Sequence, residues 1–258
     1  MYKICRVASQ EAATKGIFRM VIEAPEMARE SLPGQFVMIK AWEGTDPFLM
    51  RPISLNSVDA EAGTLTLLYK VVGKGTELMS ERRAGDEVTL LGPLGNSFRV
   101  IKGAERVALI GRGIGIAPMR CLTEAYRKQG TEVYCYLSGR SEETLYDRDK
   151  MEAAGAIVRT SIKADEKVTD FLEADIASGL KFDGAFVCGS KRLASAAKAM
   201  HREYGFPAWV SLEEHMACGV GACKACVCKA KDPATGEEHY ARVCKNGPVF
   251  DVDDLEWL

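Results

Sequence analysis

Short apolar stretches separated by glycine-containing turns fill the first part of the chain. Residues 17–22 and 64–69 are two of them, and both are rich in residues that favour β-strands. Glycines interrupt the pattern at Gly34, Gly63, Gly73, Gly85 and Gly92. Several short strands at this spacing predict a small antiparallel barrel over residues 1–98, with one short helix near residues 76–83.

The rhythm changes over residues 99–212, where short apolar strands alternate with amphipathic helices. Met119, Leu122 and Tyr126 share one face of the first of these helices. This alternation predicts a doubly wound parallel sheet. The predicted strands cover residues 106–110, 133–137, 157–161, 184–188 and 208–212. The predicted helices cover residues 118–129, 142–154, 169–177 and 191–204, and a turn covers residues 111–115.

The last segment, residues 213–258, has neither pattern. It carries a group of cysteines, a polar stretch at residues 232–237 that is typical of a hairpin, and an acidic tail. The sequence therefore predicts a β barrel followed by an α/β domain and a C-terminal appendage. A length of 258 residues fits two domains and a small addition, at roughly 150 residues per domain.

Composition and charge narrow the class of protein. Hydrophobic residues make up 47% and charged residues 27% of the chain, as in an ordinary globular protein. The 34 basic and 36 acidic residues give a net charge of −2, which argues against a nucleic-acid partner. No apolar stretch reaches the roughly 18 residues of a membrane span, and the N-terminus does not resemble a signal peptide. We therefore expect no membrane association and a cytoplasmic location.

Five of the nine cysteines fall within residues 218–244. Cys218, Cys223 and Cys226 have the spacing C-x4-C-x2-C, and Cys244 follows after 17 further residues. This is the plant-type spacing of a [2Fe–2S] cluster with a distant fourth ligand. In a reducing compartment, clustered cysteines more often bind metal than form disulfides. The sequence thus predicts an iron–sulfur cluster on these four thiolates.

Two alternatives to this ligand set remain open. Structural zinc usually takes its thiolates from paired C-x2–4-C knuckles, whereas three of these cysteines lie in one loop. Cys228 is a fifth candidate, because an extended strand would point it to the same side as Cys226. We favour Cys226, since it completes the spacing. The scattered cysteines at positions 5, 121, 135 and 188 are expected to be small buried residues.

Three short segments in the barrel region together favour a flavin site. Arg51 offers a fork of donors suited to phosphate, within the motif Arg51-Pro52-Ile53-Ser54. Tyr69, within Leu68-Tyr69-Lys70, can lie against a flat ring. Gly75 and Thr76 open the expected helix, whose amides can bind phosphate. Each segment alone is weak, and a plain surface arginine is the alternative for Arg51.

The sheet region offers a second nucleotide motif. Gly111, Gly113 and Gly115 follow a strand and precede a helix, which is the context of a pyrophosphate-binding turn. The spacing G-x-G-x-G differs from the dinucleotide fingerprint G-x-G-x-x-G, so a simple tight turn stays an alternative. Cys188 ends another parallel strand at the edge where ligands bind in such sheets. It is a candidate nicotinamide contact or a buried structural residue.

These motifs, in this order, resemble the ferredoxin–NADP reductase superfamily with an added iron–sulfur segment. The C-terminal stretches VSLEEHMACGVGAC, at residues 210–223, and VCKNGPVF, at residues 243–250, are more specific. They resemble the electron-transfer subunits of class 1B dihydroorotate dehydrogenases, and the likeness covers essentially the whole chain.

The resemblance implies a function and a set of ligands. It implies FAD bound by residues 51–54, 68–70 and 75–76, and the cluster bound by the four cysteines above. It implies an oxidoreductase subunit that passes electrons from an FMN-containing catalytic subunit, which converts dihydroorotate to orotate in pyrimidine biosynthesis, to NAD⁺. The implied assembly is an α2β2 heterotetramer. No side chain is expected to act as a general acid or base, because the cofactors carry the chemistry.

Two departures from the superfamily pattern both touch the nicotinamide site. Arg112 stands where a second glycine is common, and Ser190 replaces the proline of a C-G-P motif. Arg140 follows a strand end and can reach a ribose 2′-phosphate, so the choice of NAD over NADP rests on the family likeness. Two alternative functions remain: a similar reductase subunit that serves another dehydrogenase or a ferredoxin, and a non-enzymatic zinc-binding interaction module.

Overall fold

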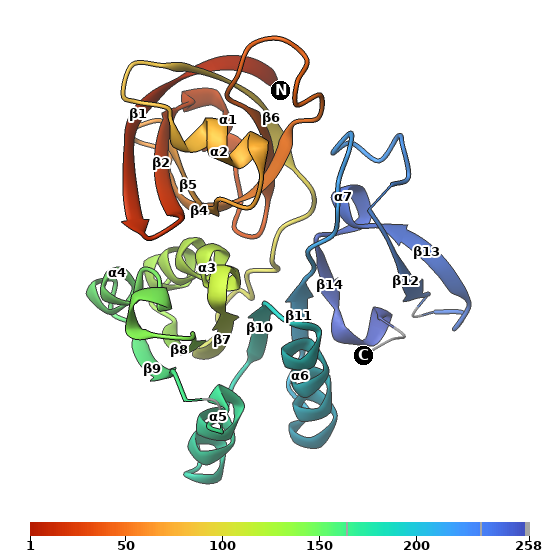
Figure 1. Ribbon diagram of the computed structural model, residues 1–258. Helices are drawn as coiled ribbons and strands as arrows, with labels where there is room; N and C mark the ends of the chain where they lie inside the picture. The colour runs from red at the N-terminus through yellow and green to blue at the C-terminus, as the bar shows by residue number, and fades with distance from the viewer. Residues whose placement is uncertain (164, 233, 256–258) are drawn as a thin grey trace.

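The computed structural model describes residues 1–163, 165–232 and 234–255, and its first part is a closed antiparallel barrel (Figure 1). Six strands close in the order β1-β2-β5-β4-β3-β6. Met20 of β2 pairs with Leu67 of β5, and both are fully buried inside the barrel. The strands are β1 (Tyr2–Thr14), β2 (Ile17–Glu23), β3 (Phe36–Lys40), β4 (Arg51–Asp59), β5 (Thr64–Lys70) and β6 (Glu87–Leu94).

Two short helices accompany the barrel. Helix α2 (Lys74–Ser80) is the helix expected near residues 76–83, and it begins two residues earlier. Helix α1 (Pro25–Glu30) is not among the expected elements. Its start fits the local sequence, because Pro25 occupies the first helical turn, where the missing N–H costs nothing. The predicted antiparallel barrel is confirmed.

The second part is a six-stranded sheet in the order β14-β11-β10-β7-β8-β9. Its first five strands in sequence are parallel, with helices packed against them (Figure 1). The predicted doubly wound parallel sheet is thus confirmed. The strands are β7 (Arg106–Arg112), β8 (Glu132–Ser138), β9 (Ile157–Ser161), β10 (Gly184–Cys188) and β11 (Ala208–Ser211), and the helices are α3 (Ala117–Lys128), α5 (Val168–Ala177) and α6 (Lys191–Tyr204).

Two predictions for this region need correction. The helix expected at residues 142–154 is split into the 3-10 turn η2 (Glu142–Thr144) and helix α4 (Arg148–Ala153). Asp147 between them has φ 56°, in the left-handed region, so a continuous helix cannot pass through it. The expected turn at residues 111–115 begins later, because β7 runs to Arg112 and the 3-10 turn η1 covers Gly113–Ile116.

The C-terminal segment is joined to the sheet rather than appended to it. Strands β12 (Val227–Lys231) and β13 (Glu238–Arg242) form a hairpin, in which Asp232 N–H donates to Glu237 O at 2.9 Å. This agrees with the hairpin expected at residues 232–237, of which residue 233 lies outside the described residues. After helix α7 (Val243–Asn246), strand β14 (Val249–Asp251) pairs antiparallel with β11, and η3 (Val252–Asp254) follows.

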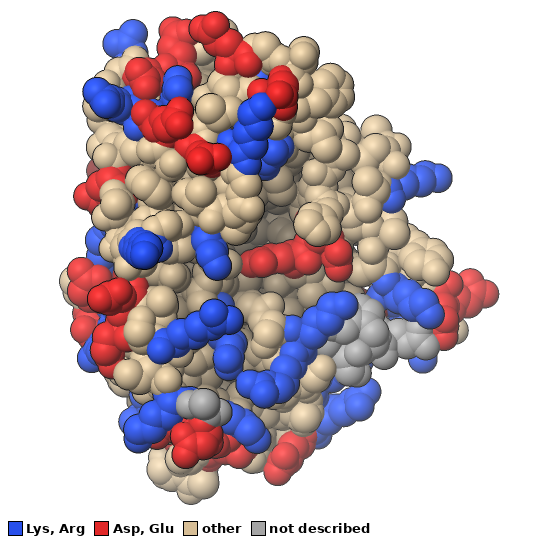
Figure 2. All heavy atoms as spheres, viewed as in Figure 1, with Lys and Arg blue, Asp and Glu red and all other residues tan. Residues whose placement is uncertain are grey.

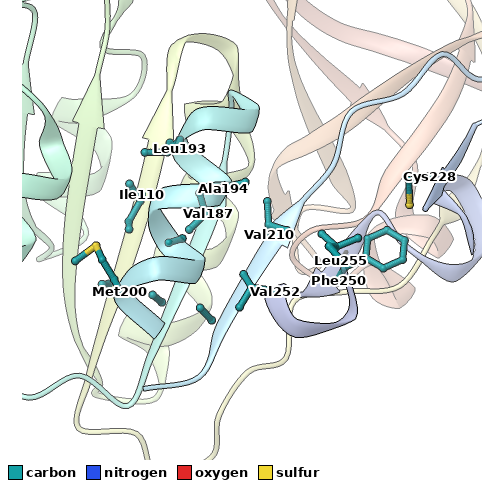
Figure 3. Close-up of a cluster of buried hydrophobic side chains, with 14 of the residues drawn as sticks. Ile110, Val187, Leu193, Ala194, Met200, Val210, Cys228, Phe250, Val252 and Leu255 are labelled. Carbon is teal, nitrogen blue, oxygen red and sulfur yellow. The ribbon is translucent and has the colours of Figure 1, made fainter. Parts of the chain in front are cut away.

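One apolar core connects the sheet, helix α6 and the C-terminal segment. In Figure 3, Leu193 and Met200 of α6 lie on the side of the helix that faces the sheet strands. Phe250 and Leu255 of the C-terminal segment belong to the same cluster, together with Cys228 of the hairpin. Residues 213–255 are therefore held by burial of apolar surface as well as by strand pairing. None of the helices in the described ranges is long and apolar enough to span a membrane.

Candidate functional site

A cavity of about 640 Å³ lies where the barrel, the sheet domain and the linker after β11 meet. Eight of the nine residues predicted to bind FAD line it; the ninth, Gly75, contacts the lining residue Arg51. The barrel contributes Arg51, Pro52, Ile53, Ser54, Leu68, Tyr69, Lys70 and Thr76. The sheet domain contributes Ile114, Ala117, Pro118 and Lys191, and the linker contributes Leu212, Glu213, Glu214, His215 and Met216.

Arg51 stands at the start of β4 and is held by several neighbours. Its guanidinium donates to the carbonyl of Leu49 and lies over the ring of Trp42, with Cζ 5.4 Å from the ring centroid. A Cβ built on Gly75 would lie 2.5 Å from Arg51 Nε. The absence of a side chain at Gly75 therefore leaves the space that the guanidinium occupies. This arrangement presents a fixed cation at the cavity wall.

Thr76 and Tyr69 use their hydroxyls within the barrel. Thr76 Oγ1 accepts from Val72 N–H at 2.9 Å and donates to Gly73 O at 2.9 Å, which fixes the turn into α2. Tyr69 OH accepts from Gln10 Nε2 at 2.7 Å, and burial raises the pKa of Tyr69 to about 12. The Tyr69 ring is nearly parallel to that of Phe18, with centroids 6.1 Å apart. Only part of Tyr69 thus borders the cavity.

The linker after β11 forms the other wall of the cavity, and Glu213 and Glu214 are its acidic residues. Figure 2 shows this face hollowed near its middle, with acidic side chains along the hollow. Desolvation by the surrounding protein raises the pKa of Glu213, although the residue as a whole is exposed. The pKa of the Cys188 thiol is raised first by its own burial and then by Glu213. Sequence reasoning missed Glu213 and Glu214; their position directly after β11, at the carboxyl edge of the sheet, was the available signal.

The predicted nucleotide-binding glycines differ in their surroundings. A Cβ on Gly115 would lie 2.6 Å from Cys188 O, and one on Gly111 would lie 3.1 Å from Ile116 Cα. Both positions require a small residue for packing between η1, β7 and β10. Gly113 has φ 56°, and a Cβ built on it would meet no atom within 4 Å, so it alone of the three has open space beside it.

A second cavity, of about 500 Å³, opens at the carboxyl ends of β7, β8 and β9. It is lined by Arg112 and Ser190, where the sequence departs from the superfamily pattern. Arg140, the candidate contact for a ribose 2′-phosphate, lines it as well. Gly111, Gly113, Gly115 and Cys188 do not. Its remaining charged lining residues are Lys163, Glu166, Lys167, Asp170, Glu173, Arg192 and Glu203.

The four predicted cluster cysteines lie on one loop and on α7. The Cys223 amide donates to Cys218 Sγ at 3.5 Å, and the Cys244 amide donates to Cys226 Sγ at 3.3 Å. The Cys223 amide is the main cause that lowers the pKa of Cys218 to about 6. Burial, followed by Cys226, raises the pKa of Cys244 to about 12.

The cysteine loop is shaped by two glycines and held by Arg242. Gly219 and Gly221 have φ of 71° and 82°, which glycine adopts without the clash a Cβ would cause. A Cβ on Gly219 would lie 2.6 Å from Met38 Cγ of β3, so the loop packs directly on the barrel. Arg242 Nη1 donates to Gly221 O at 3.0 Å.

The donor set fits an iron–sulfur cluster. Four thiolates are the usual ligands of a [2Fe–2S] cluster, and amides that donate to sulfur stabilise such ligands. Cys228 lies on β12 in the same apolar cluster as Cys226 and Cys244, and burial raises its pKa to about 11, so it is the C-x4-C-x2-C spacing rather than burial that sets it apart from the predicted ligands. Among the described residues, no group of three or more His, Cys, Asp or Glu side chains, the four cysteines included, is already arranged to hold a metal ion.

Comparison with known proteins gives two matching family profiles. One is described as the iron–sulfur cluster binding domain of dihydroorotate dehydrogenase B and matches residues 213–256. The other is described as an oxidoreductase FAD-binding domain and matches residues 5–98. The chain therefore has an FAD-binding domain and an iron–sulfur domain.

Similar whole proteins agree with these profiles. The dihydroorotate dehydrogenase B (NAD(+)) electron transfer subunit of Bacillus cereus strain Q1 is 33% identical over 252 residues, covering 96% of each chain. That of Bacillus anthracis strain CDC 684 is also 33% identical over 96% of each chain.

Solved structures share the fold. A chain of an NADH-dependent reduced ferredoxin–NADP oxidoreductase superposes with a TM-score of 0.84 at 26% identity, covering 99% of this chain and 90% of that one. A ferredoxin–NADP⁺ reductase of Neisseria gonorrhoeae with bound FAD and NADP gives 0.64 at 19% identity, covering 79% and 92%.

A barrel, a parallel-sheet domain and a cysteine quartet, in this order, define a flavin- and iron–sulfur-dependent reductase with the ferredoxin–NADP reductase fold. Within this class, the chain belongs to the family of dihydroorotate dehydrogenase B electron transfer subunits.

Proposed function

We propose that this chain carries electrons between a catalytic dehydrogenase subunit and NAD⁺ through a [2Fe–2S] cluster and FAD. One observation carries the proposal. The linker at residues 212–216 lines the cavity that the predicted FAD segments form, and the first cluster cysteine, Cys218, follows it by two residues. The two redox sites are therefore adjacent along one short stretch of chain. When bound, FAD exchanges a hydride with NAD(H) and single electrons with the cluster.

In this proposal the FAD cavity is the place where hydride and single electrons are exchanged. Arg51 binds the flavin diphosphate through its fixed guanidinium, since charge-assisted hydrogen bonds to phosphate are strong and directional. Ser54 and Lys70, at the same wall, offer further polar contacts. The wall formed by Ile114, Ala117 and Pro118 excludes water from the side of the sheet domain.

The cluster ligands are Cys218, Cys223, Cys226 and Cys244. Their amide–sulfur contacts support two pairs, Cys218 with Cys223 and Cys226 with Cys244. Together the two pairs supply the four thiolates that two irons need. The amide donors lower the cost of holding negative charge on the sulfurs. Cys228 is left as a core residue.

The nicotinamide nucleotide approaches from the carboxyl edge of the sheet. Open sheets of this type bind ligands at that edge, where the 500 Å³ cavity with Arg112 and Arg140 opens. Gly113 leaves room for the pyrophosphate, and Cys188 ends β10 at this edge, buried and lining neither cavity. We assign NAD rather than NADP by analogy with the Bacillus relatives, whose names specify NAD(+).

The assembly and location are part of the same proposal. The partner is an FMN-containing catalytic subunit that oxidises dihydroorotate, in an α2β2 heterotetramer in the cytoplasm. Division of the chain at residues 1–98, 99–212 and 213–258 into FAD, NAD and cluster units is consistent with the two matching profiles. Val220, 47% exposed on the cluster loop, offers an apolar contact for that partner.

A reconstitution experiment tests the proposal. The purified chain is mixed with the FMN subunit encoded beside it, and NAD⁺ reduction by dihydroorotate is followed at 340 nm. We expect activity from the mixture, activity from neither chain alone, and a four-chain complex by light scattering. A colourless chain without iron would favour the zinc-binding module, and activity only with another donor would remove the dihydroorotate assignment.

A second candidate function is supported by one comparison. The TM-score of 0.84 at 26% identity links the chain to an NADH-dependent reduced ferredoxin–NADP oxidoreductase. A reductase subunit that serves a ferredoxin or another dehydrogenase would use the same FAD and cluster sites. Reduced ferredoxin, offered in place of dihydroorotate and its FMN subunit, distinguishes the two: this candidate requires reduction of NAD⁺ with ferredoxin as the donor.

A further inference from the structure

A buried polar pair connects the flavin strand to the nucleotide-binding side of the molecule. Asn56 lies on β4, two residues after the FAD motif, and its side chain is fully buried. Its Nδ2 donates to Ala117 O at 2.8 Å and to Asp147 Oδ2 at 2.8 Å. Both acceptors belong to the sheet domain. Because a carbonyl and a carboxylate can only accept, the amide group must present its NH₂ to them.

Ala117 is the residue at which this connection joins the flavin cavity to the glycine turn. It begins helix α3 directly after the turn Gly113–Ile116, and it lines the flavin cavity together with Pro118. A hydrogen bond to its carbonyl therefore fixes the start of α3, and the glycine turn before it, against the strand that carries Arg51 and Ser54.

Asp147 ties further elements to the same point. Its other oxygen, Oδ1, accepts from Arg19 of β2, and Lys150 Nζ lies 3.5 Å from it. Arg120 Nη1 of α3 lies 3.9 Å from Oδ2. The Asp147 side chain is completely buried, and a buried carboxylate is tolerated only when it is paired in this way.

Two costs show that packing alone does not explain the pair. Asp147 adopts the left-handed backbone region at φ 56°, which is uncommon for residues other than glycine although aspartate enters it more readily than most. Asn56 Oδ1 is buried and has no hydrogen-bond partner among the described residues. An apolar residue at position 56 would avoid the second cost, but it would lose both hydrogen bonds across the domain boundary.

We propose that Asn56 and Asp147 are positioning residues that set the register between the flavin strand and the nucleotide-binding turn. The inference rests on the proposed exchange of hydride between NAD(H) and FAD. Neither residue lines the flavin cavity, so both act through Ala117 and the turn before it. Hydride transfer requires the donor carbon and the flavin to be aligned, and displacements of about 1 Å cost on the order of 100-fold in rate.

Asn56→Ala tests the proposal, with Ser57→Ala as the matched control. Ser57 is the next residue on β4, and its Oγ donates across the same boundary to Glu124 Oε2 of α3 at 2.7 Å. Glu124 lies seven residues beyond Ala117, about two helical turns from the cavity. Ser57→Ala therefore removes one interdomain hydrogen bond about two turns beyond the start of α3 and leaves both hydrogen bonds of Asn56 in place.

The measurement is anaerobic stopped-flow reduction of bound FAD by NADH in the assembled complex. We expect Asn56→Ala to lower the limiting rate about 10- to 100-fold, with unchanged FAD content and unchanged cluster absorbance. The charge-transfer absorbance between nicotinamide and flavin, which reports alignment directly, should weaken. Ser57→Ala should stay within about twofold of the unmodified complex in both measurements.

Asp147→Asn covers the case in which Asn56→Ala does not fold. Asparagine has the same shape but one acceptor oxygen, so Arg19 and Asn56 cannot both be satisfied. This variant should also be slower than Ser57→Ala and show a weaker charge-transfer band. Equal behaviour of these variants and Ser57→Ala would overturn the proposal. Failure of the unmodified complex to be reduced by NADH would instead overturn the proposed function.

Discussion

We predict that Gly75 controls the affinity for FAD only through Arg51. A substitution at Gly75 should therefore weaken FAD binding without unfolding the barrel. Gly75 lies in α2 without a positive φ, so alanine fits its backbone and favours the helix by about 1 kcal/mol. The new Cβ would lie 2.5 Å from Arg51 Nε and 2.6 Å from Cζ. The end of a flexible side chain can move away, so the guanidinium shifts while the barrel stays intact.

The size of the effect follows from the contact that is lost. A hydrogen bond to a charged group contributes about 1.5–3 kcal/mol. At about 1.4 kcal/mol per factor of ten, Gly75→Ala should weaken FAD binding roughly 10- to 150-fold. Arg51→Ala should do the same. The double variant should bind no worse than Arg51→Ala, because the guanidinium that Gly75 accommodates is already gone.

Fluorescence titration of the flavin-free protein with FAD measures these affinities, and thermal unfolding checks the fold. Lys74→Ala is the matched control, since Lys74 precedes Gly75 and pairs with Asp46 outside the cavity. It should change the FAD dissociation constant less than threefold. Wild-type affinity in Gly75→Ala, or effects of the two substitutions that add in the double variant, would refute the reasoning.

Three further predictions concern the other sites. Chemical analysis should find fewer than two irons per chain in Cys226→Ser. Cys228→Ser should retain two irons and two sulfides, the content of one cluster. Loss of the cluster in Cys228→Ser alone would reverse the assignment. Gly113→Val both fills the turn and strains its backbone, because a β-branched residue disfavours φ 56°; it should raise the KM for NADH at least tenfold with FAD retained, and an unchanged KM would place the pyrophosphate elsewhere. Partial desolvation raises the pKa of Glu213, so the folded protein favours the neutral carboxyl and loses stability as pH rises above the ordinary glutamate value; because the residue is exposed and screened by water, we expect Glu213→Gln to raise the Tm of the flavin-free protein only slightly at pH 8 and not at pH 4, and equal shifts at both would contradict this.

The strands and most helices were predictable because their signals are local. Apolar runs such as residues 184–188 and the amphipathic segment at 191–204 correspond to β10 and α6 without a shift at either end. The break between η2 and α4 was not predictable in this way. It depends on Asp147, whose left-handed backbone is held by Arg19 and Asn56 from the barrel, far away in sequence.

The site residues differ in the same way: some have a local sequence signal and others do not. Arg51, Ser54 and the four cysteines occur in short motifs whose spacing is itself a signal, so the sequence could single them out. Glu213 and Asn56 have no such motif. Glu213 matters because the linker after β11 folds over the cavity, and Asn56 because α3 begins opposite β4. Only the packing of separate elements brings either residue to the site.

Strand β14 joins the cluster segment to the sheet, which the sequence did not predict. A three-residue strand has too little pattern to be recognised, so the sequence suggested an appendage. In the structure, Asn96, just after the barrel, exchanges two hydrogen bonds with Val249: its Nδ2 donates to Val249 O at 2.7 Å, and its Oδ1 accepts from Val249 N–H at 3.0 Å.

The cysteine loop is thereby fixed from both sides. Val249 of β14 is anchored to the barrel exit through Asn96, and Gly219 lies directly on Met38 of the barrel wall. Tight interiors do not deform continuously, so these contacts hold the cysteines at a set position relative to the cavity. In the proposed function, in which electrons pass between the cluster and FAD, the packing of Gly219 and Val249 also keeps the two sites at a fixed separation.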